Sequence, residues 1–268
     1  MTDYVTLSYG DLALGSVFIF INAVLSIALE LSIHRRILIA AARMVVQLSI
    51  MGLVLTALFA VVSPFWTSLA ALGMVLFAGR EIAARQDKPL GGLWSYGLGT
   101  VCMMIGPMTV TVFALTTVLR SDPWYDPRYA VPVLGMILGN AMTGIALGIS
   151  GLVNGLTTRR AAVEAQLMLG ATRRSAMLPV IREALRSALM PIINSMSAIG
   201  IVSLPGMMTG QILGGVAPGE AVKYQILIMF LIAGGTGIGA VTAVMGAAYR
   251  LTDGRHRLRL DRLGPGKA

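Results

Sequence analysis

Charged residues are scarce in this chain. Only 12% of its 268 residues are Asp, Glu, Lys or Arg, whereas 56% are hydrophobic, and an ordinary soluble domain carries about 25% charged residues. The composition therefore excludes a typical soluble domain and predicts an all-α, polytopic integral membrane protein. Cysteine is also nearly absent, since Cys102 is the single one and lies within an apolar stretch, so no disulfide framework is available.

Motifs for nucleotide binding and catalysis are missing as well. The chain contains no Gly-x-x-x-x-Gly-Lys-Ser/Thr phosphate loop, because the closing Gly264-Pro-Gly-Lys267 has neither the spacing nor the hydroxyl. There is no His-Glu-x-x-His pair and no cluster of aspartates. We therefore expect a non-catalytic chain that binds no cofactor itself, and a membrane-embedded enzyme is the weaker alternative.

Seven apolar stretches are each long enough to cross about 30 Å of hydrocarbon, which takes about 20 helical residues. They are predicted at residues 11–31, 37–62, 65–84, 91–119, 131–153, 187–213 and 222–248. Glycines recur at four-residue spacing in two of them, as at Gly144 and Gly148 or Gly235 and Gly239. Small residues at this spacing let membrane helices approach closely, so we expect packing seams there.

The basic residues are unevenly distributed. Most of the 21 lysines and arginines fall in the first, third and fifth connections and in the tail at residues 250–268, whereas Arg120, Arg128 and Lys223 fall in the others. Because loops rich in Lys and Arg stay in the cytoplasm, this pattern predicts an external amino terminus and a cytoplasmic carboxyl terminus. The net charge of +9 is then explained by topology and by contact with membrane lipid, and no nucleic-acid partner is expected.

A charged helical segment separates the fifth and sixth stretches. Residues 155–186 are rich in helix-forming side chains but contain Gly170 and Pro179. We expect two short cytoplasmic helices joined by a turn at residues 170–172, with Thr172 capping the second helix. An amphipathic linker on the lipid surface is the alternative, but a sharp turn favours docking into a groove on a protein.

This segment resembles the coupling element of ABC transporter permeases, which is read as Glu-Ala-x-x-x-x-Gly followed by Leu-Pro. Here Leu178-Pro179 follows the glycine sooner than in most importers, and together with the run from Ser203 to Gln211 it is similar to FetB-type iron-export permeases and to plant aluminium-tolerance membrane proteins. The residues that the resemblance assigns to ATPase coupling are Glu164, Ala165, Gly170, Ala171, Thr172, Arg173 and Arg174.

The resemblance covers nearly the whole chain and implies a single permease domain over residues 1–268 in a bacterial cytoplasmic (inner) membrane. It implies export of iron or another metal ion, driven by a separate ABC ATPase that binds ATP and Mg²⁺. It also implies a homodimer, because such transporters place two membrane subunits over two ATPases. A non-metal cargo such as a sugar nucleotide or a lipid remains open, as does a secondary transporter or channel.

Polar side chains within hydrocarbon are costly and therefore mark candidate transport pathways. The candidates are Arg43, Gln47, Asn140, Asn194, Ser197, Ser203 and Gln211. Hydrogen bonding between helices is the alternative role for each of them. Met196, Met207 and Met208 are candidate soft metal ligands, although packing explains most methionines in so apolar a chain, and no intramembrane cluster of His, Asp or Glu offers a conventional iron site.

Overall fold

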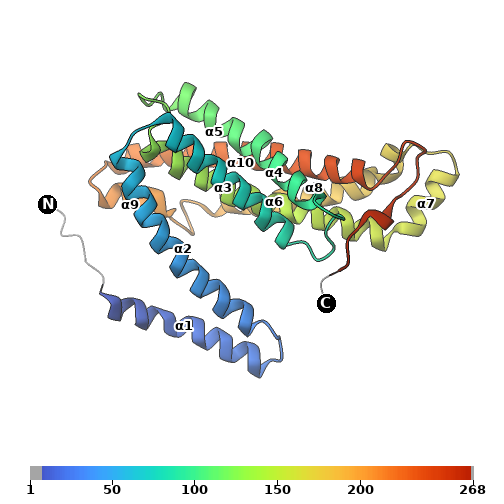
Figure 1. Ribbon diagram of the computed structural model, residues 1–268, viewed down its shortest axis with the longest axis horizontal. Coiled ribbons are helices and arrows are strands. Elements are labelled where there is room, and N and C mark those ends of the chain that lie inside the picture. The colour runs from blue at the N-terminus through green and yellow to red at the C-terminus, as the bar shows by residue number, and fades with distance from the viewer. Residues whose placement is uncertain (1–7, 267–268) are drawn as a thin grey trace. The chain divides into compact units, whose positions relative to one another are not determined.

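A computed structural model describes residues 8–266, and these are predominantly helical (Figure 1). Within this range six helices are long and apolar enough to cross a membrane, so the chain is a polytopic helical membrane protein. They are α1 (Tyr9–Ala28), α2 (His34–Ala60), α3 (Pro64–Ala84), the run Trp94–Val118, α6 (Pro127–Thr158) and α10 (Pro218–Arg250). The chain divides into two compact units, the first formed mainly by α1 and α2.

The first unit is a helical hairpin. Ser8 caps α1 reciprocally: its hydroxyl accepts from the Asp11 amide at 3.3 Å, and the Asp11 carboxylate accepts from the Ser8 amide at 2.8 Å. Between the helices the Ile33 amide donates to the Ser26 hydroxyl at 3.1 Å. Two predicted pathway residues, Arg43 and Gln47, belong to α2 and thus to this unit.

The second unit is organised around α6, α8 (Arg173–Ala198) and α10. α8 runs antiparallel to α6, because Gly155 packs on Val180 while Gly144, further back along α6, packs on Ala188. A Cβ on Gly144 would come within 2.9 Å of the Ala188 carbonyl oxygen. The predicted glycine seams are therefore confirmed, and this one joins helices of the same chain.

The fourth apolar stretch is one helical run with two π-type turns. It comprises α4 (Trp94–Met103), η1 (Met104–Met108), α5 (Thr109–Phe113) and η2 (Ala114–Val118). Pro107 lies in the first π turn, which absorbs its missing amide. The adjacent Gly106 approaches α10 so closely that a Cβ would come within 2.6 Å of the Gly239 amide nitrogen, which explains the glycine at each of these positions.

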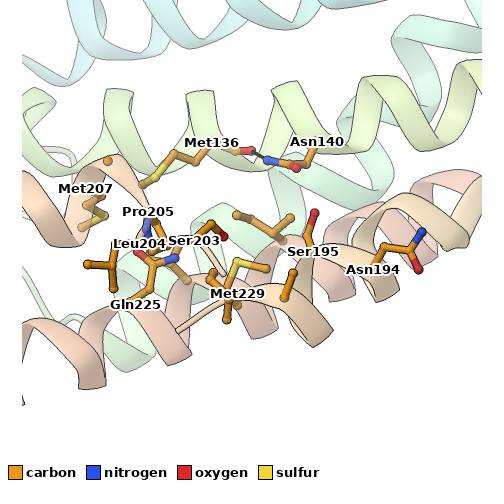
Figure 2. A pocket seen from close by; sticks show the side chains of 15 residues that line it. Met136, Asn140, Asn194, Ser195, Ser203, Leu204, Pro205, Met207, Gln225 and Met229 are labelled. Carbon is orange, nitrogen blue, oxygen red and sulfur yellow. Dashed lines mark hydrogen bonds between the residues drawn. The ribbon is translucent and has the colours of Figure 1, made fainter. Parts of the chain in front are cut away.

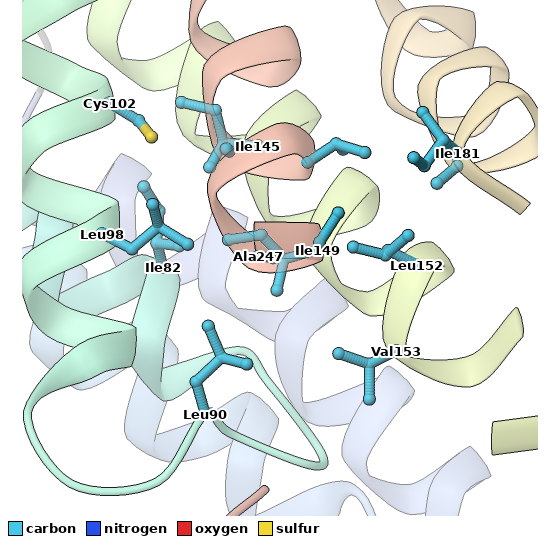
Figure 3. Close-up of a cluster of buried hydrophobic side chains, with 14 of the residues drawn as sticks. Ile82, Leu90, Leu98, Cys102, Ile145, Ile149, Leu152, Val153, Ile181 and Ala247 are labelled. Atoms are coloured by element: carbon cyan, nitrogen blue, oxygen red, sulfur yellow. The ribbon is translucent and has the colours of Figure 1, made fainter. Parts of the chain in front are cut away.

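The buried core of this unit joins α3, α4, α6, α8 and α10 (Figure 3). Ile82, Cys102, Ile145 and Leu152 are wholly inaccessible in it, and Ile181 contributes from α8. Each helix presents apolar side chains to several neighbours, so the core holds the middle of α8 firmly against α6 and α10.

Residues 187–213 do not form one span, contrary to the sequence prediction. α8 ends at Ala198, Gly200 takes a left-handed conformation with φ +86°, and the eight-residue α9 (Gly206–Leu213) begins after Pro205. The first half of α8 carries Arg173, Arg174, Arg182, Glu183 and Arg186, so this helix is long but not apolar throughout. The count of seven spans is therefore not confirmed, and the orientation of the termini stays a prediction.

Pro179 does not end a helix, which corrects the expectation of two short helices. α8 passes through both Pro179 and Pro191 as one helix of 26 residues. Each proline removes one backbone hydrogen bond, but the neighbouring Met177, Val180 and Ile181 are buried. Packing of that face compensates for the local loss, so the helix continues.

Candidate functional site

A cavity of about 650 Å³ opens between α6, α8, α10 and the segment at residues 199–205 (Figure 2). Among the sequence candidates, it brings together Asn140, Asn194, Ser203 and Met207. Asn140 comes from α6 and Asn194 from α8, so residues far apart in the sequence meet around one space. The cavity is within the size range of small-molecule sites.

One polar side chain of the cavity, Asn140, is bonded to its own helix. The Asn140 amide donates to the Met136 carbonyl oxygen at 2.9 Å, as the dashed line in Figure 2 shows. Asn140, Asn194 and Ser203 are all exposed, and Ser195 follows Asn194 along the wall. These groups are thus open to a molecule that enters the cavity.

The non-helical segment after α8 forms one wall of the cavity. The Gly200 amide donates to the Ser203 carbonyl oxygen at 2.9 Å, and Ile199 pairs with Ser203 in an isolated bridge. The positive φ of Gly200 permits this tight loop, because a residue with a Cβ rarely adopts it. The loop places Ser203, Leu204 and Pro205 against the cavity.

Gln225 is the functional candidate that the sequence interpretation missed. It lies on α10, lines the cavity and is only 8% exposed, and its Oε1 has no hydrogen-bond partner in the described part of the chain. A buried polar atom without a partner is uncommon and costly. The available signal was an amide within an apolar stretch, the same criterion that selected Asn140 and Asn194.

The remaining candidates of this unit lie elsewhere. The Ser197 hydroxyl donates to the Ile193 carbonyl oxygen at 2.9 Å. Gln211 lies on α9, and its buried Oε1 has no partner among the described residues. Neither residue lines the cavity. Met196 and Met208 line a neighbouring, more apolar cavity of about 390 Å³. Over residues 8–266 no group of three or more His, Cys, Asp or Glu is arranged to hold a metal ion.

The predicted turn lies at the other end of α8. The helix α7 (Arg160–Met168) ends there, Gly170 takes φ +89°, and the Thr172 hydroxyl accepts from the Ser175 amide at 3.3 Å. The helix, the turn and the Thr172 cap are therefore as predicted. Sequence reasoning overlooked the apolar tip, where Met168 and Leu169 are 83% and 88% exposed.

The charged residues beside the turn are mostly engaged within the chain. Glu164 forms an ion pair with Arg160 at 2.8 Å. The Arg173 amide donates to Nδ1 of His256 at 3.1 Å, its guanidinium donates to the Asp253 carbonyl oxygen at 3.4 Å, and it lies 5.4 Å from the Tyr249 ring centroid. Arg173 is thus bonded to the tail through both its backbone and its side chain. Of the remaining residues assigned to coupling, Ala165 lies on α7, Ala171 lies within the turn and Arg174 lies on α8.

The basic tail is folded. The Gly91 amide donates to the Arg262 carbonyl oxygen at 2.7 Å, so the tail joins the connection between α3 and α4. Hydrogen bonds from the Arg257 amide and side chain, together with the Arg255 amide, lower the pKa of Asp253. The two-pronged bond from Arg259, at 2.8 Å for each arm, lowers the pKa of Asp261 to about 2. The tail therefore links the connection between α3 and α4, through Arg262, to the start of α8, through His256.

Long apolar helices, a cavity with polar side chains among them and a helical turn at the far end of α8 together describe a polytopic helical membrane protein. The chain belongs to the Uncharacterised protein family (UPF0014), whose model matches residues 9–252.

Three relatives extend this finding. The chain is 33% identical to "Protein ALUMINUM SENSITIVE 3" of Arabidopsis thaliana, over 86% of this chain and 82% of the relative. It is 37% identical to "UPF0014 membrane protein STAR2" of Oryza sativa subsp. japonica, over 82% and 77%. It is 29% identical to "Probable iron export permease protein FetB" of Escherichia coli (strain K12), over 94% and 95%. No solved structure matches the chain.

Proposed function

We propose that this chain is the membrane permease subunit of an ATP-driven exporter of iron or another metal, energised by a separate ABC-type ATPase. The observation that carries the proposal is the continuity of α8, which has the turn at one end and the polar cavity at the other. The name of the Escherichia coli relative supports the direction and the cargo. The chain itself supplies no phosphate loop, so the energy comes from the partner.

The helix α8 acts as a lever in this mechanism. Its 26 residues span about 39 Å at 1.5 Å per residue. Binding of ATP closes two ATPase subunits on each other, and the attached turn moves with them. Because the middle of α8 packs closely against α6, this movement shifts the wall that carries Asn194 and alters access to the cavity.

The turn is the contact with the ATPase. Met168 and Leu169 present apolar side chains to the surroundings, and exposed apolar groups at the tip of a helix fit a groove on a partner. Arg174 lies at the edge of that contact, where its charge steers association more than it adds affinity. Two copies of the chain over two ATPases complete the transporter in a bacterial inner membrane.

Transport into inverted vesicles tests the proposal. Vesicles that contain this chain and its ATPase are given ATP and, in separate assays, iron, zinc and manganese. We expect ATP-dependent accumulation of iron inside the vesicles, because export from a cell becomes uptake after inversion. Accumulation that is equal without ATP would replace the proposal with a secondary transporter or channel, and failure of every metal would remove the metal cargo.

A further inference from the structure

The cavity contains no charged side chain among its lining residues, all of which the structure describes. Its polar groups are the amides of Asn140, Asn194 and Gln225 and the hydroxyls of Ser195 and Ser203. The other side chains around it are apolar or thioethers. Neutral groups of this kind form hydrogen bonds but do not compensate a net charge.

This lining is poorly suited to a bare divalent cation. Hard cations in proteins are held by oxygen ligands, among which carboxylates supply the compensating charge and carbonyl oxygens or water complete the shell, and an unpaired charge is costly to remove from water. Thioethers are soft ligands that favour Cu(I) over iron, and Met136, Met207 and Met229 are the sulfur groups available. Neither the neutral amides and hydroxyls nor the thioethers of this lining compensate the charge of Fe²⁺.

The size of the cavity points in the same direction. A volume of about 650 Å³ falls within the range of roughly 300–1,000 Å³ that accommodates small organic molecules. A site for a single ion is a small space with converging ligands, whereas this cavity is wide. An organic molecule fills it better than an ion does.

Gln225 adds a requirement on the ligand. Its Oε1 is buried and has no partner among residues 8–266, and Gln225 lines both this cavity and the neighbouring apolar one. A hydroxyl group on the ligand would satisfy such an acceptor after a small rotation of the side chain. The unpaired amide therefore favours a ligand that carries hydrogen-bond donors.

We propose that the cavity receives its metal as an uncharged chelate bearing hydroxyl groups, and that Gln225 recognises one of those hydroxyls. This inference rests on the proposed function, in which the cavity is part of the transport route. The chelator's anionic oxygens neutralise the metal before it enters, so the protein supplies only hydrogen bonds and apolar contacts. The negative charge that balances the metal thus belongs to the cargo and not to the protein.

Binding to the full chain in lipid nanodiscs tests this inference without the ATPase. The probes are ferric tris(kojate), which is neutral and carries hydroxymethyl groups, ferric tris(allomaltolate), which has methyl groups at those positions, and Fe²⁺ under anaerobic conditions. We expect saturable binding of the kojate complex, about tenfold weaker binding of the allomaltolate complex, and no saturable binding of Fe²⁺. Nanodiscs without protein correct for partition into lipid.

Variants connect the binding to Gln225. Gln225→Leu is expected to weaken kojate binding about tenfold and to reduce its preference over allomaltolate. Thr242→Val is the matched control, because Thr242 is also on α10 but bonds the Ile238 carbonyl oxygen and does not line the cavity. Equal effects of the two variants would contradict the role of Gln225.

The outcomes separate this inference from the proposed function. One outcome would overturn the inference and leave the exporter intact. In it, Fe²⁺ binds saturably and independently of Gln225 and is taken up with ATP, whereas the kojate complex neither binds nor is transported. Binding of the kojate complex without ATP-driven uptake would support the cavity's specificity and overturn the exporter. Neither binding nor uptake of any probe would overturn both.

Discussion

The two ends of α8 differ in charge, neighbours and exposed chemistry. The amino-terminal end carries Arg173 and Arg174, contacts the folded tail, and lies beside the apolar tip at Met168 and Leu169. The carboxyl-terminal end presents Asn194 and Ser195 to a cavity with no charged lining. In the proposed function, the first end contacts the ATPase and the second contacts the neutral cargo.

The middle of α8, between these two ends, is packed closely against α6. Ala184 and Ala188 pack on Gly151 and Gly144 of α6 so closely that a larger residue would not fit without displacement. A helix held in this way transmits a rigid movement instead of bending, because tightly packed interfaces shift between discrete arrangements. In the proposed function, the turn therefore receives the movement of the ATPase, the glycine seam transmits it and the cavity responds to it.

The largest effect is expected at the turn. Met168→Asp combined with Leu169→Asp removes the apolar tip, and we expect binding of the ATPase to weaken by roughly tenfold to a hundredfold, in line with the loss of an interface hot spot. Co-purification and titration of the ATPase measure it. Leu93→Asp is the control, because Leu93 is also 83% exposed and Asp suits its position as the N-cap of α4. Equal weakening in the control would contradict a specific role for the tip.

The next largest effect is expected at the glycine seam, where α6 and α8 pack together. Gly144→Ala would place a Cβ 2.7 Å from Thr236 and 2.9 Å from the Ala188 carbonyl oxygen, so we expect a loss of about 1–3 kcal/mol in unfolding free energy. Gly139→Ala, on the same helix with nothing within 4 Å, is expected to be neutral or slightly stabilising. Thermal unfolding in detergent compares the two. Equal stability would show that α6 and α8 are less tightly packed.

A smaller effect is expected in the cavity. Asn194→Leu removes a polar group from the wall, and we expect ATP-driven transport to fall about fivefold, the equivalent of one hydrogen bond of about 1 kcal/mol. Asn140→Leu is expected to act similarly. Ser197→Ala on the same helix should leave transport unchanged, since Ser197 does not line the cavity. Normal transport in both asparagine variants would remove them from the route.

The folded tail gives the smallest effect. The pKa of Asp253 and of Asp261 is lowered in the folded tail, so their bonds stabilise it fully above the ordinary carboxyl pKa of about 4 and are lost as the pH falls toward 2. A spin label at Arg255→Cys, with the native Cys102 buried, should stay immobile from pH 8 to 5 and become mobile as the pH falls from about 4 toward 2. Asp261→Asn should increase mobility at pH 7. Unchanged mobility would contradict these bonds.

The sequence predicted the membrane class, most of the spans and the turn, because apolar length, Gly170 and Thr172 are local signals. It failed at residues 187–213, where the conformation of Gly200 ends α8, and at Pro179, where burial of the flanking residues sustains the helix. Polarity within apolar stretches located Asn140, Asn194 and Ser203. Their meeting with Gln225 depends on tertiary packing, which no local pattern contains. The docking of Arg173 on the tail was hidden for the same reason.

ATP-dependent iron uptake by inverted vesicles, measured side by side for the unchanged chain and for Met168→Asp with Leu169→Asp, tests the central claim that α8 couples the turn to the cavity. The account predicts uptake that requires ATP and the ATPase and that is lost in the variant, while the variant still binds the cargo in nanodiscs as the unchanged chain does. Uptake that persists in the variant, or that proceeds without ATP, would contradict it.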